Sequence, residues 1–167
     1  MTIGDSMTLT GTGIIDGTLS LLDNAKLVPG SSPGTLEVDQ LIASDSNQTL
    51  FVEINGTTPG TEHDQLVVNG PVTLNGMTLD VTLGYVPSGG ETITLINNLD
   101  ADPVNGTFDG LAQDATVTIS GYDATISYTG GDGNDVELVF VNPNTAPTAG
   151  DVNGVAVEDG GPVVIAY

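Results

Sequence analysis

Short runs of alternating apolar and polar residues, separated by Gly, Asn, Asp and Pro, dominate this sequence. In the run at 77–83, Leu79, Val81 and Leu83 fall on one side of an extended chain and polar residues fall on the other. That period of two is typical of a half-buried β-strand, and no window keeps a helical period over a useful length. The pattern therefore predicts an all-β protein with strands at residues 18–22, 35–38, 49–54, 65–68, 77–83, 91–96, 115–119, 124–128 and 135–141.

The runs at 17–21 (GTLSL), 34–38 (GTLEV) and 76–81 (GMTLDV) are alike. Such units are typical of a solenoid, in which the inward side chains of one coil pack on those of the next and glycines supply turns with positive φ. Their spacing is irregular, however, and many short strands joined by turns also suit a β-sandwich. The pattern alone leaves both architectures open.

A change of composition near residue 142 predicts a boundary. The segment 142–149 (NPNTAPTA) follows an apolar run and holds two Pro and two Asn among small residues. Because Pro and Asn interrupt regular structure, we interpret this segment as a linker. The chain then divides into a module at 1–141, the linker at 142–149 and a C-terminal piece at 150–167 that is too short to close a sandwich. The alternative is that this piece adds a last strand to the same domain.

The charge of the chain excludes one class of partner. Asp and Glu number 22, whereas Lys26 is the only Lys or Arg, so the formal net charge is -21. Nothing could neutralise phosphates, so we expect no nucleic-acid partner, and an anionic membrane would be repelled. Membrane insertion is not expected either, because no run approaches the roughly 18 apolar residues of a membrane helix. The self-repulsion opposes compaction, so screening by salt or bound divalent cations is expected to favour the fold.

Stability must come from the apolar core, because the chain has no Cys for disulfides or thiolate metal sites. With 167 residues and 38% hydrophobic composition, the chain is large enough for one such core. No basic segment precedes an apolar one at the start, so the sequence reads as part of a longer exported protein.

One turn has the residues of a cation site. Residues 130–135 (GGDGND) match the first six positions of the calcium nonapeptide G-G-x-G-x-D-x-U-x, but Glu137 occupies its apolar position and only one copy occurs. The segment also reads as a plain turn before the last strand. Asp132, Asn134 and Asp135 are the candidate metal ligands, because their oxygens suit a single hard cation, and calcium is the candidate cofactor.

Two other polar segments attract attention. Asp100 and Asp102 begin a loop that resembles an EF-hand loop but has Gly106 one position too late, so we interpret it as an acidic loop. His63 lies between Glu62 and Asp64 and could bind metal or sense pH, although a residue of the loop before the 65–68 strand is the preferred interpretation.

Four segments resemble, in the same order, the passenger-associated repeat region of bacterial autotransporters and related large surface adhesins. They are GSSPGTLEV at 30–38, LFVEING at 50–56, DQLVVNG at 64–70 and YTGGDGNDV at 128–136, and the resemblance runs from about 19 to 140. It implies a right-handed parallel β-helix with a C-terminal capping segment at 106–140, with the β-sandwich as the alternative. The residues after the linker resemble the start of a cadherin-like or Ig-like domain, truncated at 150–167.

This resemblance implies a non-enzymatic structural or adhesive module of an exported protein, located outside the cell or on the bacterial cell surface. Its partners would be a surface ligand or neighbouring adhesin domains, with the ligand left open. One alternative is a calcium-dependent binding module. Another is a fragment of a β-helical, polysaccharide-active enzyme. Carboxylates for a glycosidase are too plentiful here to single out a catalytic pair, and a lyase of the pectate type would need a basic residue, for which only Lys26 is present.

Overall fold

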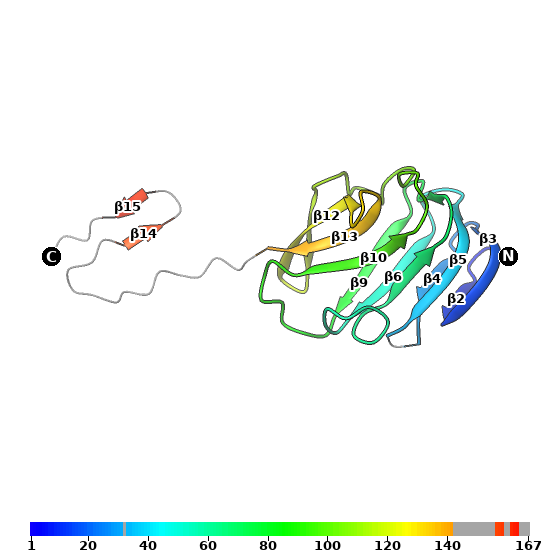
Figure 1. The fold of residues 1–167 in the computed structure, drawn as a ribbon, viewed down its shortest axis with the longest axis horizontal. Helices are drawn as coiled ribbons and strands as arrows, with labels where there is room; N and C mark the ends of the chain where they lie inside the picture. Colours follow the sequence, from blue (N-terminus) through cyan, green and yellow to red (C-terminus); the bar gives the residue numbers. More distant parts are fainter. Residues whose placement is uncertain (32, 142–155, 159–160, 164–167) are drawn as a thin grey trace.

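The computed structural model describes residues 1–31, 33–141, 156–158 and 161–163, which contain β-strands and no helix. The strands form a β-solenoid of about three turns (Figure 1). Its strands are β1 (Thr2–Ile3), β2 (Thr8–Gly11), β3 (Gly13–Leu21), β4 (Lys26–Pro29), β5 (Thr35–Ala43), β6 (Thr49–Ile54), β7 (Gln65–Val68), β8 (Val72–Thr73), β9 (Thr78–Leu83), β10 (Thr92–Asn98), β11 (Thr116–Ile119), β12 (Tyr122–Gly130) and β13 (Asp135–Phe140).

Parallel pairing between successive layers builds the solenoid. A four-stranded sheet has the order β2-β4-β6-β9, and a nine-stranded sheet runs from β1 through β3, β5, β7 and β10. We call each strand of the first sheet, with the strands of the second that follow it, a layer: β2 with β3, β4 with β5, β6 with β7 and β8, and β9 with β10. Because these strands pair in parallel across layers, the chain is a parallel β-helix and the sandwich alternative is wrong.

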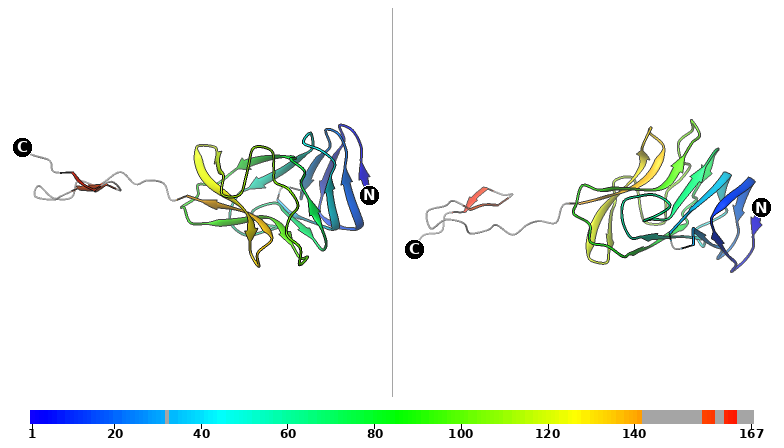
Figure 2. Two further views of the ribbon diagram at one scale, coloured as in Figure 1. Left: turned by 90° about the horizontal axis from the view of Figure 1, so that it is seen from above. Right: turned by 60° about the horizontal axis from the view of Figure 1, so that its bottom comes forward.

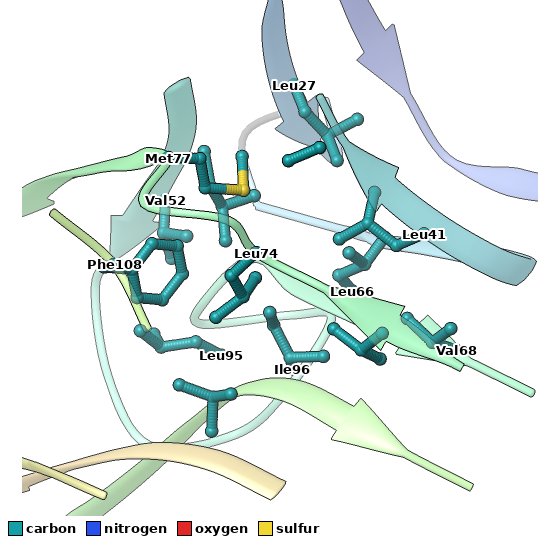
Figure 3. Close-up of a cluster of buried hydrophobic side chains, with 14 of the residues drawn as sticks. Leu27, Leu41, Val52, Leu66, Val68, Leu74, Met77, Leu95, Ile96 and Phe108 are labelled. Atoms are coloured by element: carbon teal, nitrogen blue, oxygen red, sulfur yellow. The ribbon is translucent and has the colours of Figure 1, made fainter. Parts of the chain in front are cut away.

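Inward-facing aliphatic side chains stack from layer to layer and form the core. Leu9 pairs with Leu27, Leu27 with Leu50, and Leu50 with Leu79, and the two central leucines are fully buried. Figure 3 shows how such side chains point toward one another between the sheets. Burial of a leucine contributes roughly 1.5–3 kcal/mol, so these ladders are the main source of stability. Similar ladders join Leu36, Leu66 and Ile96, and Leu19, Leu41 and Val72.

The layers differ in length mainly at one corner. From the four-stranded to the nine-stranded sheet the chain crosses in one residue (12), five (30–34), ten (55–64) and eight (84–91) in successive layers. The return crossing takes four residues (22–25), five (44–48) and four (74–77). We call the variable crossing the loop corner. In a solenoid, insertions gather at such corners because a longer loop does not change the register of the stacked core residues.

Antiparallel strands end the parallel stack at the C-terminal side. β13 pairs antiparallel with β10, β12 with β13, and β11 with β12. Figure 2 shows these strands at the end of the stack opposite the N-terminus. Phe108 and Phe140 are buried beneath them. β13 occupies the edge of β10 at which a further parallel strand would pair, so this part is the expected capping segment.

The predicted linker at 142–149 lies outside the described residues. Of the C-terminal piece at 150–167, the structure describes β14 (Ala156–Glu158) and β15 (Gly161–Val163), which pair antiparallel as a hairpin. The cadherin-like or Ig-like start therefore stays a prediction.

Candidate functional site

The three predicted metal ligands lie at the turn between β12 and β13. The N–H of Gly133 donates to the carbonyl of Gly130 at 2.8 Å, which closes the turn. Asp132 is exposed at its tip, whereas Asn134 and Asp135 are buried at its base. The turn therefore brings the three residues together, with two of their side chains directed into the molecule.

Asp135 ties the turn to the end of β10. One of its carboxylate oxygens, Oδ1, accepts the backbone N–H of Asn98 at 2.8 Å. Burial raises the pKa of the Asp135 carboxyl, the bond from Asn98 opposes that rise, and the charges of Asp132 and Glu137 add to it. The excess of negative charge around this carboxylate would be relieved by a proton or a cation.

Asn134 ties the turn to the acidic loop that the sequence presents separately. Its Nδ2 donates to the carbonyls of Asp100, at 2.5 Å, and Asp102, at 3.3 Å. The Nδ2 of Asn98 also donates to the Asp102 carbonyl, at 3.1 Å. Two motifs more than thirty residues apart thus meet at the end of β10. The pairing of β10 with β13 creates this contact, and no local pattern in the sequence predicts it.

Acidic side chains alone do not form a metal centre here. Across the described ranges, no three His, Asp or Glu side chains gather closely enough to hold a metal ion. Any cation at the β12–β13 turn would need amide or backbone carbonyl oxygens beside the carboxylates, which is usual for calcium.

Asp64, at the loop corner, is a buried carboxylate that sequence reasoning passed over. It is only 1% exposed. Its Oδ1 accepts the N–H of Gly34 at 2.8 Å and its Oδ2 accepts the N–H of Glu53 at 3.0 Å. Burial raises the pKa of this carboxyl, and the two backbone donors oppose the rise. Asp64 therefore joins the second layer to the third through backbone groups.

His63 lies beside it in the loop before β7 and is also buried. Its Nδ1 is 3.2 Å from the carbonyl oxygen of Gly56, and its Nε2 is buried without a hydrogen-bond partner. Burial lowers the pKa of the imidazole, while the facing carbonyls and the charges of Asp64 and Glu62 act in the opposite direction. Burial therefore favours the neutral form of the ring inside the corner.

A column of three carboxylates runs along the opposite corner. Asp5 accepts the side-chain amide of Asn24 at 3.2 Å. The pKa of Asp23 is raised, mainly by a hydrogen bond with the Asp45 carboxyl and next by the charge of Asp45. The pKa of Asp45 is lowered, mainly by the hydrogen bond that it accepts from the backbone N–H of Asn47. Asp5 and Asp23 are exposed and Asp45 is partly exposed, so water and salt screen the column.

No protein-family model, curated protein or solved structure matches this chain. The likeness to passenger-associated repeats therefore rests on the four sequence segments alone.

Within the portion that the structure describes, no helix is both long and apolar enough to span a membrane.

Proposed function

We propose that this chain is a non-enzymatic structural or adhesive module of an exported bacterial surface protein, and that it acts outside the cell as a stiff spacer or display surface. The observation that carries the proposal is the continuous leucine ladder from Leu9 to Leu79, which joins four layers into one core. In such a stack, bending requires the ladder to separate, so the solenoid resists deformation along its axis.

The buried carboxylates support a structural rather than an enzymatic role. Catalytic carboxylates need an open side toward a substrate, and a glycosidase needs two of them across one bond. Asp64 and Asp135 are the buried carboxylates with raised pKa, and each is engaged by backbone N–H groups of neighbouring segments. These hydrogen bonds hold neighbouring segments together and bury both carboxylates, which argues against the polysaccharide-active alternative.

The loop corner supplies the display surface. Its loops at 55–64 and 84–91 vary in length while the core beneath them stays in register. Loops on a rigid scaffold are the usual carriers of binding function. A surface ligand or a neighbouring adhesin domain would therefore meet the molecule at this corner, and the acidic exterior would keep the module soluble.

Stiffness can be tested with spin labels, because the chain has no native Cys. One label pair joins the first layer to the cap, at the exposed positions Met7→Cys and Thr116→Cys. A control pair on one strand, Thr78→Cys and Asp80→Cys, reports label mobility alone. We expect the long pair to give a single distance distribution as narrow as that of the control pair, unchanged from low to high salt. A broad or salt-dependent distribution would contradict the stiff spacer.

The enzyme alternative has its own test. The unlabelled wild-type protein is incubated with neutral and acidic polysaccharides, and new reducing ends and unsaturated products are measured. We expect neither above a blank. Product formation that is lost in a carboxylate variant would overturn the non-enzymatic assignment.

A further inference from the structure

The end of β10 is surrounded by oxygen atoms from two segments. The carbonyls of Asp100 and Asp102 face the side chain of Asn134, and Asp135 reaches the same strand end through Asn98. Asp132 lies two residues before Asn134 in the same turn. The side chains of the turn and the backbone of the acidic loop therefore converge on one small region.

One oxygen in this region lacks a partner. Asn134 is 6% exposed, and its Oδ1 is buried with no hydrogen bond, although its Nδ2 donates to two carbonyls. A buried acceptor without a hydrogen bond destabilises the folded state, so such an atom in a folded protein calls for an explanation. Among the described residues, no donor reaches this amide oxygen.

We propose that this region is a calcium site, in which Asn134 Oδ1 and the carboxylates of Asp132 and Asp135 bind the ion together with the carbonyl oxygen of Asp100. Calcium takes six to eight oxygen ligands of mixed type, including carboxylate, amide and backbone oxygens. Four residues supply this mixture, and water completes the shell. The Asp100 carbonyl accepts one hydrogen bond and keeps a second lone pair for the ion, whereas the Asp102 carbonyl already accepts two hydrogen bonds.

The local charge favours a divalent cation. Asp100, Asp102, Asp132, Asp135 and Glu137 all lie on these two segments. Lys26 is the single Lys or Arg of the chain, and its Nζ lies 4.2 Å from the centre of the Phe51 ring on the four-stranded sheet. It therefore does not neutralise these carboxylates. Magnesium would fit less well, because it demands a near-ideal octahedron and keeps most of its water.

The site would have a mechanical consequence. The loop at 99–103 leaves the last parallel strand, and the turn at 131–134 belongs to the capping hairpin. A bound ion would join the two and so fasten the cap to the stack. Calcium in the surroundings would then set the stability of the capped end, whether the module is a spacer or binds a ligand.

The test compares matched charge variants by calorimetric titration and thermal unfolding, with calcium chloride, magnesium chloride or chelator at fixed high ionic strength. Asp132→Asn removes one charge at the exposed tip of the proposed site, and Asp80→Asn removes one from the exposed face of β9. We expect calcium to bind the wild type and Asp80→Asn alike and to raise both unfolding midpoints. Asp132→Asn should bind at least about tenfold more weakly, and magnesium should act less than calcium.

Asn134→Ala tests the amide oxygen itself, and folding is checked first in chelator. Amide resonances of Asn98, Asp102 and Asp135 should shift on calcium addition in the wild type and not in this variant. Equal calcium responses in Asp132→Asn and Asp80→Asn would show screening only and overturn the site. The absence of any calcium response in the wild type would overturn it as well.

Discussion

Two buried polar side chains in this molecule accept hydrogen bonds from backbone N–H groups at the corners of the solenoid. Loops that cross from sheet to sheet carry N–H groups that no neighbouring strand can satisfy, and each one left unpaired in the interior is costly. At one corner, Gln48 accepts the N–H of Asp45 and donates to the side chains of Ser44 and Asp45 in its own loop. At the other corner, Asp64 accepts the N–H groups of Gly34 and Glu53 from two other segments. These polar residues are part of the stacking mechanism, and their removal should affect stability more than any surface property.

Replacing Asp64 should destabilise the fold strongly. Asp64→Ala leaves the N–H groups of Gly34 and Glu53 without their acceptor, and we expect the free energy of unfolding to fall by about 2–4 kcal/mol. Asp64→Asn keeps one acceptor oxygen and should cost less. Urea denaturation measures both, with Asp80→Asn as the exposed control. An Asp64→Ala protein as stable as that control would contradict the role of Asp64.

The buried imidazole of His63 should make the fold sensitive to mild acid. Its pKa in the folded protein lies below the ordinary 6.5, so below pH 6.5 the unfolded chain takes up the proton first. The stability contributed by neutral His63 is therefore present above pH 6.5 and is lost as the pH falls toward the folded pKa. Asp64 and Asp135 act with the opposite sign, because their raised pKa values favour protonation of the folded state in acid.

The difference between the wild type and His63→Gln isolates the imidazole from these carboxyls. Chemical denaturation of both proteins between pH 7.5 and about pH 5 should give a steeper loss of stability in the wild type. Parallel profiles would mean that His63 titrates alike in the folded and unfolded states, contrary to its burial.

At the scale of elements, the sequence predicts where several strands lie, but it predicts too short a range for β5. The alternating runs at 49–54 and 65–68 coincide with β6 and β7, because a strand that lies on one face keeps a strict period of two. The sequence predicts that β5 ends at residue 38, because Asp39 interrupts the apolar alternation. In the structure, β5 continues to Ala43. Asp39 lies opposite a shift in the pairing register of β3, and its carboxylate accepts the N–H of Gly17 at 2.5 Å.

The stacking period and the candidate site could not be predicted in the same way. Thr8 pairs with Lys26, Lys26 with Thr49 and Thr49 with Thr78, which are steps of 18, 23 and 29 residues. The loop corner absorbs most of the difference, so the regular core produces an irregular spacing in the sequence. The meeting of Asn134 with the acidic loop depends on the pairing of β10 with β13, which is a long-range event.

A close turn at the loop corner should tolerate no side chain. Gly30 has φ of 107°, and a Cβ there would lie 2.3 Å from Asp64 Oδ1 and 2.5 Å from the Gly34 nitrogen. Gly13 has a similar φ of 115° but open space around the same position. Gly13→Ala should therefore cost about 1–2 kcal/mol through backbone strain alone, and Gly30→Ala clearly more, because it also breaks the Asp64 contact. Urea denaturation compares the two, and equal losses would contradict the steric argument.

For the whole molecule, the leucine ladders and the net charge of -21 act against each other. The ladders are insensitive to salt at first order, whereas repulsion among exposed carboxylates is screened as the Debye length shortens from about 30 Å at 0.01 M salt to about 3 Å at 1 M. We therefore expect sodium chloride to raise the unfolding midpoint by roughly 5–10 °C over this range in the presence of chelator. Potassium chloride should act alike, and sucrose of equal osmolality should act less.

A charge-reduced variant makes this prediction specific. Asp16→Asn, Asp80→Asn and Asp109→Asn together change three exposed residues and bring the formal charge from -21 to -18. If repulsion limits stability, the unfolding midpoint of the variant is higher than that of the wild type at low salt. At high salt the two midpoints converge, because screening weakens the same repulsion that the substitutions reduce. Equal midpoints of the two proteins at 0.01 M salt would show that the exposed carboxylates lie too far apart to matter. The ladders alone would then set the stability, and the benefit of a saline exterior would have to come from specific ion binding.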